Sequence, residues 1–131
     1  MPITWGWGLG DRVRVLVAED CQDTALTYAT FLKLAGYEVR VVCDGRAAVE
    51  AAVAERPDVA VVDIGLPVMT GLEVAEAIRQ QPDLQGVRLI AVTGYGQRDD
   101  VRRGQEAGFD HYLVKPVDPA DLLPLLTSKT A

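Results

Sequence analysis

Apolar runs of strand length recur along the chain from residue 13 onward. Five runs rich in β-branched residues span residues 13–18, 39–42, 59–62, 89–92 and 112–114. Nearly every position in each run is apolar, which is typical of parallel strands that are covered on both faces. We therefore predict five buried strands in one parallel sheet.

The stretches between these runs have the spacing of helices. In the first stretch, apolar residues recur at i, i+3, i+4 and i+7, namely at Tyr28, Phe31, Leu32 and Ala35. Gly36 then predicts a left-handed helix end. Alternating strands and helices predict the α/β class, with a single doubly wound (βα)₅ unit built around the sheet.

One domain accounts for most of the chain. We predict a folded domain over residues 13–127 and a tail at residues 128–131. Residues 1–12 show no clean period, and are either a poorly ordered leader or linker, or an extension that packs Trp5 and Trp7 on the domain. Pro124 lies inside residues 121–126, so we expect the last helix to be short or kinked.

Composition and charge exclude several classes of protein. The chain has 131 residues, of which 49% are hydrophobic and 24% charged, and its net charge is -6. This acidity, without a cluster of Lys and Arg, argues against direct binding to nucleic acid. No apolar run reaches the ~20 residues of a membrane-spanning helix, and the N-terminus lacks the layout of a signal peptide. Cys21 and Cys43 lack metal-binding spacing and fit reduced thiols, so we expect a cytoplasmic protein.

Polar residues follow four of the five predicted strands. Glu19 and Asp20 follow the first strand, Asp63 the third, Thr93 the fourth and Lys115 the fifth. Parallel strands place their carboxyl ends at one edge of the sheet, where open α/β sheets bind ligands. We therefore expect three carboxylates, one hydroxyl and one ammonium group to converge there.

These five groups point to phosphoryl chemistry. Crowded carboxylates repel one another, and one lysine cannot neutralise three of them. An all-oxygen donor set selects Mg²⁺, or Mn²⁺, over Zn²⁺. Lys115 and Thr93 can hold the oxygens of a phosphoryl group, and one of the acids can act as its nucleophile. The sequence therefore predicts phosphoryl transfer to a carboxylate.

Four segments, taken in order, resemble the receiver domain of two-component response regulators. They are VRVLVAED, PDVAVVDIGLPVMTGLEVA, LIAVTGYG and GFDHYLVKPVD, and the resemblance covers residues 13–126. It implies a flavodoxin-like sheet with the strand order 2-1-3-4-5. It also implies that Asp63 is phosphorylated beside a magnesium ion. Asp20 would bind that ion directly, Glu19 through water, and Gly65 through its backbone carbonyl.

The resemblance further implies a switch. Thr93 would bind one phosphoryl oxygen and act as the switch hydroxyl, while Lys115 would pair with another oxygen. Tyr112 matches an aromatic residue that changes rotamer on activation, and Lys115–Pro116 matches a cis peptide bond of the family. Phosphorylation would then repack the face formed by the fourth strand, the fourth helix and the fifth strand.

The partners implied by the resemblance are phosphodonor proteins. The donor would be a sensor histidine kinase or a histidine phosphotransfer domain, and the chain would catalyse its own phosphorylation and dephosphorylation. Residues 94–118 look most like receivers attached to hybrid sensor kinases. The chain is therefore either a stand-alone receiver or one cut from such a kinase, and in the second case the full protein would be a histidine kinase. The sequence leaves the cognate kinase, the pathway and homodimer formation open.

Three alternative functions use the same kind of sheet. A receiver that is never phosphorylated would serve as an interaction module, and a phosphorylation assay separates it from an active one. A phosphatase of the haloacid-dehalogenase type needs a second acid two residues after its nucleophile, where this chain has Gly65. A carrier of flavin mononucleotide needs a first loop that binds phosphate, which Glu19 and Asp20 would repel.

Overall fold

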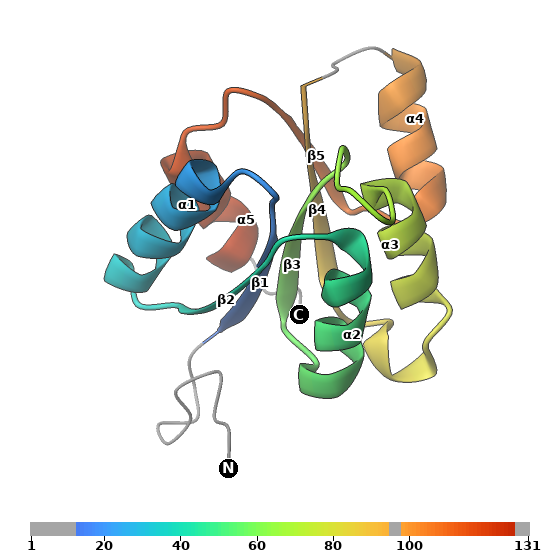
Figure 1. The fold of residues 1–131 in the computed structure, drawn as a ribbon, viewed down its shortest axis with the longest axis horizontal. Helices are drawn as coiled ribbons and strands as arrows, with labels where there is room; N and C mark the ends of the chain where they lie inside the picture. The colour runs from blue at the N-terminus through green and yellow to red at the C-terminus, as the bar shows by residue number, and fades with distance from the viewer. Residues whose placement is uncertain (1–12, 95–97, 128–131) are drawn as a thin grey trace.

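A computed structural model describes residues 13–94 and 98–127 of the chain (Figure 1). The predicted leader at residues 1–12 and the predicted tail at residues 128–131 lie outside this part, so both stay predictions. Within the described residues, no helix is long and apolar enough to cross a membrane.

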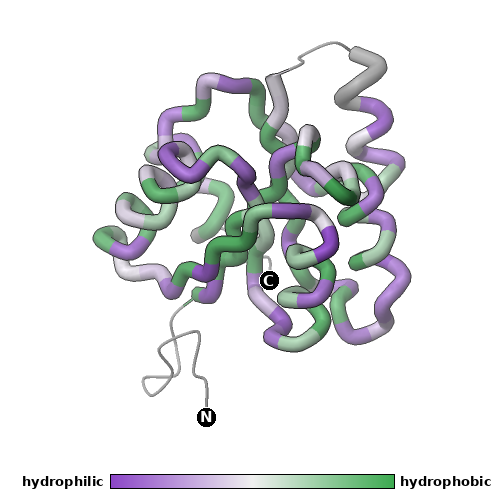
Figure 2. Tube along the Cα trace, in the orientation of Figure 1, coloured by the Kyte–Doolittle hydropathy of each residue, from purple (hydrophilic) through white to green (hydrophobic). Residues whose placement is uncertain are grey.

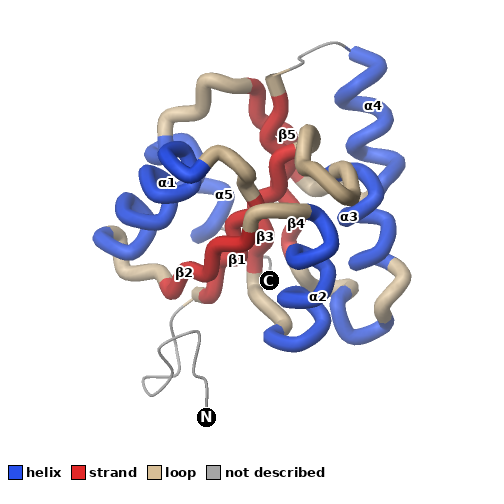
Figure 3. Tube along the Cα trace, viewed as in Figure 1, coloured by secondary structure: helices blue, strands red, loops and turns tan. Residues whose placement is uncertain are grey.

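Five parallel strands form the sheet, in the order β2-β1-β3-β4-β5 (Figure 3). This confirms the predicted fold class and strand order. Each strand begins and ends within one residue of its predicted bounds. The strands are β1 (Arg14–Ala18), β2 (Glu38–Val42), β3 (Val59–Asp63), β4 (Arg88–Thr93) and β5 (His111–Val114).

Helices cover both faces of the sheet. One face carries α1 (Gln22–Leu34) and α5 (Leu123–Thr127), and the other carries α2 (Gly45–Glu55), α3 (Gly71–Arg79) and α4 (Arg98–Ala107), as Figure 1 shows. Successive strand residues point to opposite faces, so each strand contributes to two separate hydrophobic cores. Val15 and Val17 of β1 lie in the core under α1 and α5, whereas Leu16 lies in the core under α2 and α3.

Burial differs between the central and the outer strands. The three central strands are almost fully buried, as predicted, whereas most residues of β2 and β5 are only half-buried. Val41 of β2 and Val114 of β5 are even exposed. The prediction of burial on both faces is therefore wrong for β2 and β5, because each ends the sheet and has a neighbouring strand on one side alone. Figure 2 shows the contrast in hydropathy between the central strands and the later turns of α4, which are hydrophilic.

Local signals account for the helix ends. Asp44 caps α2 by accepting a hydrogen bond from the Ala47 amide, and Thr70 and Glu73 form a capping box at the start of α3. Gly36 follows α1 with a φ of 102°, in the left-handed region that its sequence position predicts.

The last helix is short, as its proline predicts. A 3₁₀ turn, η2 (Pro119–Leu122), leads into α5, and Pro124 is the second residue of that helix. A proline is tolerated in a first helical turn because the amide it lacks has no partner there. Leu122 and Leu126 still reach the core, and the Arg88 guanidinium donates to the Leu125 carbonyl over 2.6 Å.

Candidate functional site

Parallel topology brings the predicted site residues to one edge of the sheet. Glu19 and Asp20 directly follow β1, Asp63 ends β3, Thr93 ends β4, and Lys115 directly follows β5. These are the carboxyl ends of the strands, the edge where open α/β sheets bind ligands. The acids and the lysine lie far apart in the sequence, and the fold brings them together.

Three carboxylates form an acidic cluster at this edge. The acidic cluster consists of Glu19, Asp20 and Asp63, whose ligating oxygens all lie within 4.8 Å of one another. Asp20 is exposed, whereas Glu19 and Asp63 are 2% and 7% exposed. Burial and the nearby charge of Asp63 raise the pKa of Glu19, although a hydrogen bond from the Cys21 amide opposes this shift.

Lys115 is the cation of the site. Its ammonium nitrogen lies 2.9 Å from Oδ2 of Asp63 and 3.4 Å from Oε1 of Glu19. Burial alone would lower the pKa of Lys115, but the hydrogen bond with Asp63 and the charges of Asp63 and Glu19 raise it. Lys115 is therefore charged at neutral pH, yet it balances only part of the negative charge of the acidic cluster.

The donor set of the acidic cluster fits Mg²⁺. All three side chains offer carboxylate oxygens, which hard divalent cations prefer, and no described histidine or cysteine takes part in the cluster. The charge that Lys115 leaves unbalanced also favours a cation. The same donor set fits Mn²⁺.

Asp63 is held from both sides. Its Oδ1 accepts a hydrogen bond of 2.9 Å from the Gly65 amide, while its Oδ2 accepts one from Lys115. The Gly71 backbone packs directly behind it, since a Cβ atom on Gly71 would lie 2.6 Å from the Asp63 carbonyl oxygen. The Gly71 amide also donates to the Ile64 carbonyl over 2.9 Å. The carboxylate therefore has a fixed orientation.

The loop between β3 and α3 contains a residue that sequence reasoning missed. The Pro67 carbonyl accepts hydrogen bonds from the amides of Met69 and Gly45, which anchors the loop to the start of α2. Val68, between these contacts, has a φ of 75° and is 73% exposed. A positive φ is rare for a β-branched residue. Because this conformation depends on the loop contacts, the residue type gave no signal of it.

Thr93 and Tyr112 lie on neighbouring strands. Thr93 pairs with Val114 and Ala91 pairs with Tyr112, so the alternation of side chains places Thr93 and Tyr112 on the same face of the sheet. Thr93 is 1% exposed and Tyr112 is half-buried. The Lys115 amide donates to the Thr93 carbonyl over 2.7 Å, and the peptide bond between Lys115 and Pro116 is cis.

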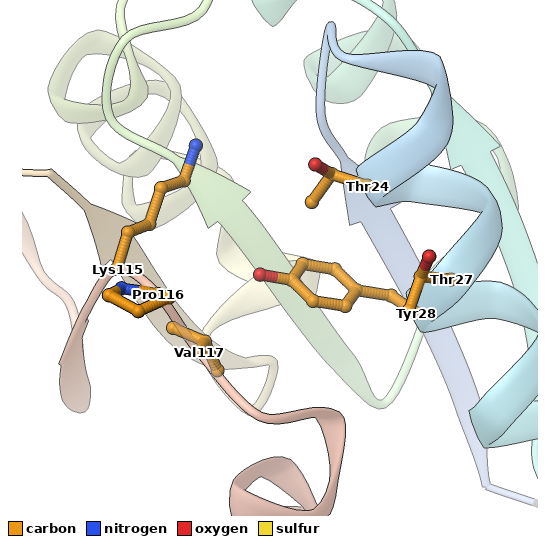
Figure 4. Close-up of a pocket in the computed structure, with 6 residues that line it drawn as sticks. All are labelled: Thr24, Thr27, Tyr28, Lys115, Pro116 and Val117. Carbon is orange, nitrogen blue, oxygen red and sulfur yellow. The ribbon is translucent and has the colours of Figure 1, made fainter.

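A pocket of about 440 Å³ adjoins Lys115, between α1 and the loop after β5 (Figure 4). Tyr28 of α1 crosses this space, and Figure 4 shows its hydroxyl pointing toward the Lys115–Pro116 segment. Burial and the nearby charge of Glu19 raise the pKa of Tyr28. The helical spacing predicted Tyr28 as a residue of the apolar helix face, and no sequence signal indicated its place beside the site. The pocket is lined by Thr24, Thr27, Tyr28, Lys115, Pro116 and Val117.

Known proteins match almost the whole described part of the chain. Residues 15–127 match the family model of the response regulator receiver domain. The transcriptional regulatory protein PrrA of Mycobacterium bovis is 38% identical over 110 residues, which are 84% of this chain and 46% of that protein. The chain thus spans about half the length of this curated relative.

Solved structures share the fold over nearly their full length. The chemotaxis response regulator CheY4 of Vibrio cholerae superposes with a TM-score of 0.85 at 32% identity, covering 91% of this chain and 99% of that one. The receiver domain of the sensor histidine kinase PA1611 of Pseudomonas aeruginosa, solved with a magnesium ion in its active site cleft, gives 0.83 at 31% identity, covering 90% and 97%. The chain therefore belongs to the response regulator receiver domains of two-component signalling.

Proposed function

We propose that this receiver domain accepts a phosphoryl group on Asp63 in a reaction that depends on Mg²⁺. The observation that carries the proposal is the setting of the Asp63 carboxylate. One of its oxygens lies 2.9 Å from the Lys115 ammonium, and it shares the acidic cluster with Glu19 and Asp20. A nucleophilic carboxylate, a cation beside it and an oxygen-rich metal site are the parts that phosphoryl transfer requires.

The metal would be bound in three ways. Asp20 and Asp63 would bind it through their carboxylates, Glu19 through water, and Gly65 through its backbone carbonyl. When bound, Mg²⁺ supplies positive charge that neutralises the carboxylates and the phosphoryl oxygens. The buried position of Glu19 and the high exposure of Asp20 support this division between a supporting and a more accessible ligand.

Phosphoryl transfer follows from the orientation of Asp63. A carboxylate oxygen attacks the phosphorus of a phosphohistidine, and the new O–P bond replaces the N–P bond, whose electron pair returns to the imidazole nitrogen. Lys115 stabilises the negative charge on one phosphoryl oxygen, and the Thr93 hydroxyl donates a hydrogen bond to another. The product is an aspartyl phosphate at position 63.

The switch is the response of Thr93 and Tyr112 to that product. The phosphoryl group adds about −1.5 to −2 charges at the carboxyl edge of the sheet. Thr93 moves toward these acceptors, and Tyr112 moves into the space that Thr93 leaves. Their positions on the same face of β4 and β5 support this coupling, which repacks the face formed by β4, α4 and β5.

The phosphodonor is a sensor histidine kinase or a histidine phosphotransfer domain. The matched proteins include a transcriptional regulator, by sequence, and the receiver domain of a sensor histidine kinase, by structure. A hybrid kinase as the full protein and a homodimer as the active form therefore stay predictions. The net charge of -6 supports a protein rather than a nucleic acid as the direct partner of this chain.

Intact mass spectrometry after incubation with acetyl phosphate tests the proposal. We expect the mass of one added phosphoryl group, which requires Mg²⁺ and disappears in Asp63→Asn. Asp83→Asn is the matched control, because Asp83 is an exposed aspartate that pairs with Arg56 away from the site. An adduct that persists in Asp63→Asn would contradict the assignment of the acceptor.

A lack of any adduct would need a second measurement, because rapid hydrolysis also removes the phosphoryl group. Beryllofluoride with Mg²⁺ forms a stable mimic of the aspartyl phosphate, and its binding would indicate an active receiver. Failure of both measurements in folded protein would favour the alternative function, an interaction module that is not phosphorylated.

A further inference from the structure

Gly104 is a buried glycine in the interior of α4. A glycine at such a position makes a helix less stable than alanine would, so its presence calls for a contact that a side chain would prevent. That contact is the ring of Tyr112. A Cβ atom on residue 104 would lie 2.7 Å from Cε2 and 2.9 Å from Cδ2 of Tyr112, closer than carbon atoms can pack.

The Tyr112 ring, rather than the helix, would yield to such a Cβ atom. The ring is the far end of a side chain that turns about its first torsion angle, whereas the backbone around Gly104 is fixed by its own hydrogen bonds. The Gly104 carbonyl accepts from the amides of Gly108 and Phe109, over 3.2 Å and 3.0 Å. The observed position of Tyr112 therefore depends on the missing side chain at position 104.

Tyr112 connects this contact to the phosphoacceptor edge. It shares a face of the sheet with Thr93, the last residue of β4. Val92, the residue before Thr93, pairs with Asp63 on β3, and its carbonyl accepts a hydrogen bond of 3.0 Å from the Ile64 amide. One strand, β4, thus separates Tyr112 on β5 from Asp63 on β3, and Thr93 is the last residue of that strand.

We propose that Gly104 is a positioning residue that holds Tyr112 against α4 in the unphosphorylated protein. The inference rests on the proposed function, because it says where the Tyr112 ring lies before Asp63 is phosphorylated. When Thr93 is drawn toward the phosphoryl group, the ring leaves Gly104 and α4 loses a contact on its inner side. A side chain at position 104 would therefore disfavour the resting state and favour the phosphorylated one.

Beryllofluoride binding in the presence of Mg²⁺ measures this bias. If phosphorylation moves the Tyr112 ring away from Gly104, then displacing the ring must in turn favour binding at Asp63, because such coupling is reciprocal. Gly104→Ala should therefore tighten beryllofluoride binding about fivefold, at the lower end of allosteric couplings. Gly86→Ala is the matched control, since a Cβ atom on Gly86 would meet no atom within 4 Å. Unchanged or weaker binding in Gly104→Ala would overturn the proposal.

A double-mutant cycle separates ring positioning from a general effect on α4. In a Tyr112→Ala background, Gly104→Ala should leave beryllofluoride binding unchanged, because no ring remains to be displaced. The same fivefold gain in that background would show that the gain comes from helix propensity, and the proposal would be overturned.

Fluorine NMR of protein labelled with 3-fluorotyrosine tests the ring position without any phosphoryl mimic. Tyr112→Phe identifies the resonance of Tyr112, which should shift in Gly104→Ala and stay in place in Gly86→Ala. An unshifted resonance would overturn the proposal. If the parent protein neither gains a phosphoryl group nor binds beryllofluoride, the proposed function fails, while this measurement still decides whether Gly104 positions the Tyr112 ring.

Discussion

Glu19 is a carboxylate with almost no exposed surface, and a second carboxylate, Asp63, lies beside it. Its raised pKa means that the folded protein without metal holds the Glu19 proton more tightly than the unfolded chain does. The charged form of Glu19 therefore opposes folding, and the residue serves the binding of a cation at the expense of stability.

The stability of the metal-free protein should therefore depend on pH. A raised pKa makes the free energy of unfolding fall as pH rises above 4.5, the ordinary pKa of Glu19, toward the higher value in the folded state. In metal-free protein at pH 7, Glu19→Gln should raise the free energy of unfolding and should flatten this fall. Urea unfolding with a chelator between acidic and neutral pH measures both effects.

Glu76→Gln is the matched control for that experiment, because Glu76 is exposed on α3. We expect it to change the free energy of unfolding by less than about 0.5 kcal/mol. A Glu19→Gln protein that is less stable than the parent at neutral pH would mean that the Lys115–Glu19 contact outweighs the burial of the charge.

At the scale of elements, α5 is joined to the sheet by a side-chain hydrogen bond in addition to its contacts with the hydrophobic core. The helix has five residues and a proline at its second position, so few of its backbone groups are bonded within the helix. The Arg88 guanidinium, at the start of β4, donates to the Leu125 carbonyl in the last turn of α5. This hydrogen bond compensates for the short length of α5. The Arg88 cation near the helix C-terminus also interacts favourably with the helix dipole.

Arg88→Met should therefore loosen α5. We expect a loss of about 1.5–3 kcal/mol in the free energy of unfolding, the range for hydrogen bonds to charged groups, and faster hydrogen exchange in α5 than in α1. Arg46→Met is the comparison, because Arg46 forms an exposed pair with Glu50 whose contribution is about 0.3–0.5 kcal/mol. Equal losses in the two variants would contradict the role of Arg88.

Sequence patterns predicted the elements and the acidic edge well, because both follow from local rules. Strand ends and parallel order sufficed to bring Glu19, Asp63 and Lys115 together. Contacts across the sheet were not predictable in this way. The Gly104 contact with the Tyr112 ring requires the packing of α4 on β5, and the left-handed backbone of Val68 depends on hydrogen bonds made by its neighbours.

The Arg79 contacts show the same limit at the scale of elements. Arg79 is the last residue of α3, a position where a basic residue is ordinary. Its guanidinium instead bonds the carbonyls of Gly108 and Val87 and the carboxylate of Asp110, joining α3 to the turn before β5. Backbone carbonyls carry no sequence signal, so only the folded chain could reveal these partners.

For the whole molecule, the residues that stabilise the fold and the residues of the candidate site lie in different places. Two hydrophobic cores lie along the length of the sheet, whereas the acidic cluster occupies its carboxyl edge. A ligand at that edge binds the native state alone, because the unfolded chain does not bring the three acids together. Ligand binding should therefore raise the stability of the whole domain.

Titration with MgCl₂ should raise the midpoint of thermal unfolding. The gain in free energy is about 2.7 kcal/mol when the free ion reaches one hundred times its dissociation constant. Asp20→Asn should reduce the gain, since it removes one ligand and leaves the Asp63–Lys115 pair intact. An equal rise with KCl at matched ionic strength would mean that charge screening, rather than a bound ion, stabilises the protein.

The strand order also has a consequence for synthesis on the ribosome. The chain emerges from its N-terminus, so Glu19, Asp20 and Asp63 appear before Lys115, which follows the last strand. Until β5 arrives, β4 has an unpaired edge, and the three carboxylates lack the ammonium that balances part of their charge. Nascent chains that pause before residue 111 should therefore be the forms that chaperones and proteases recognise.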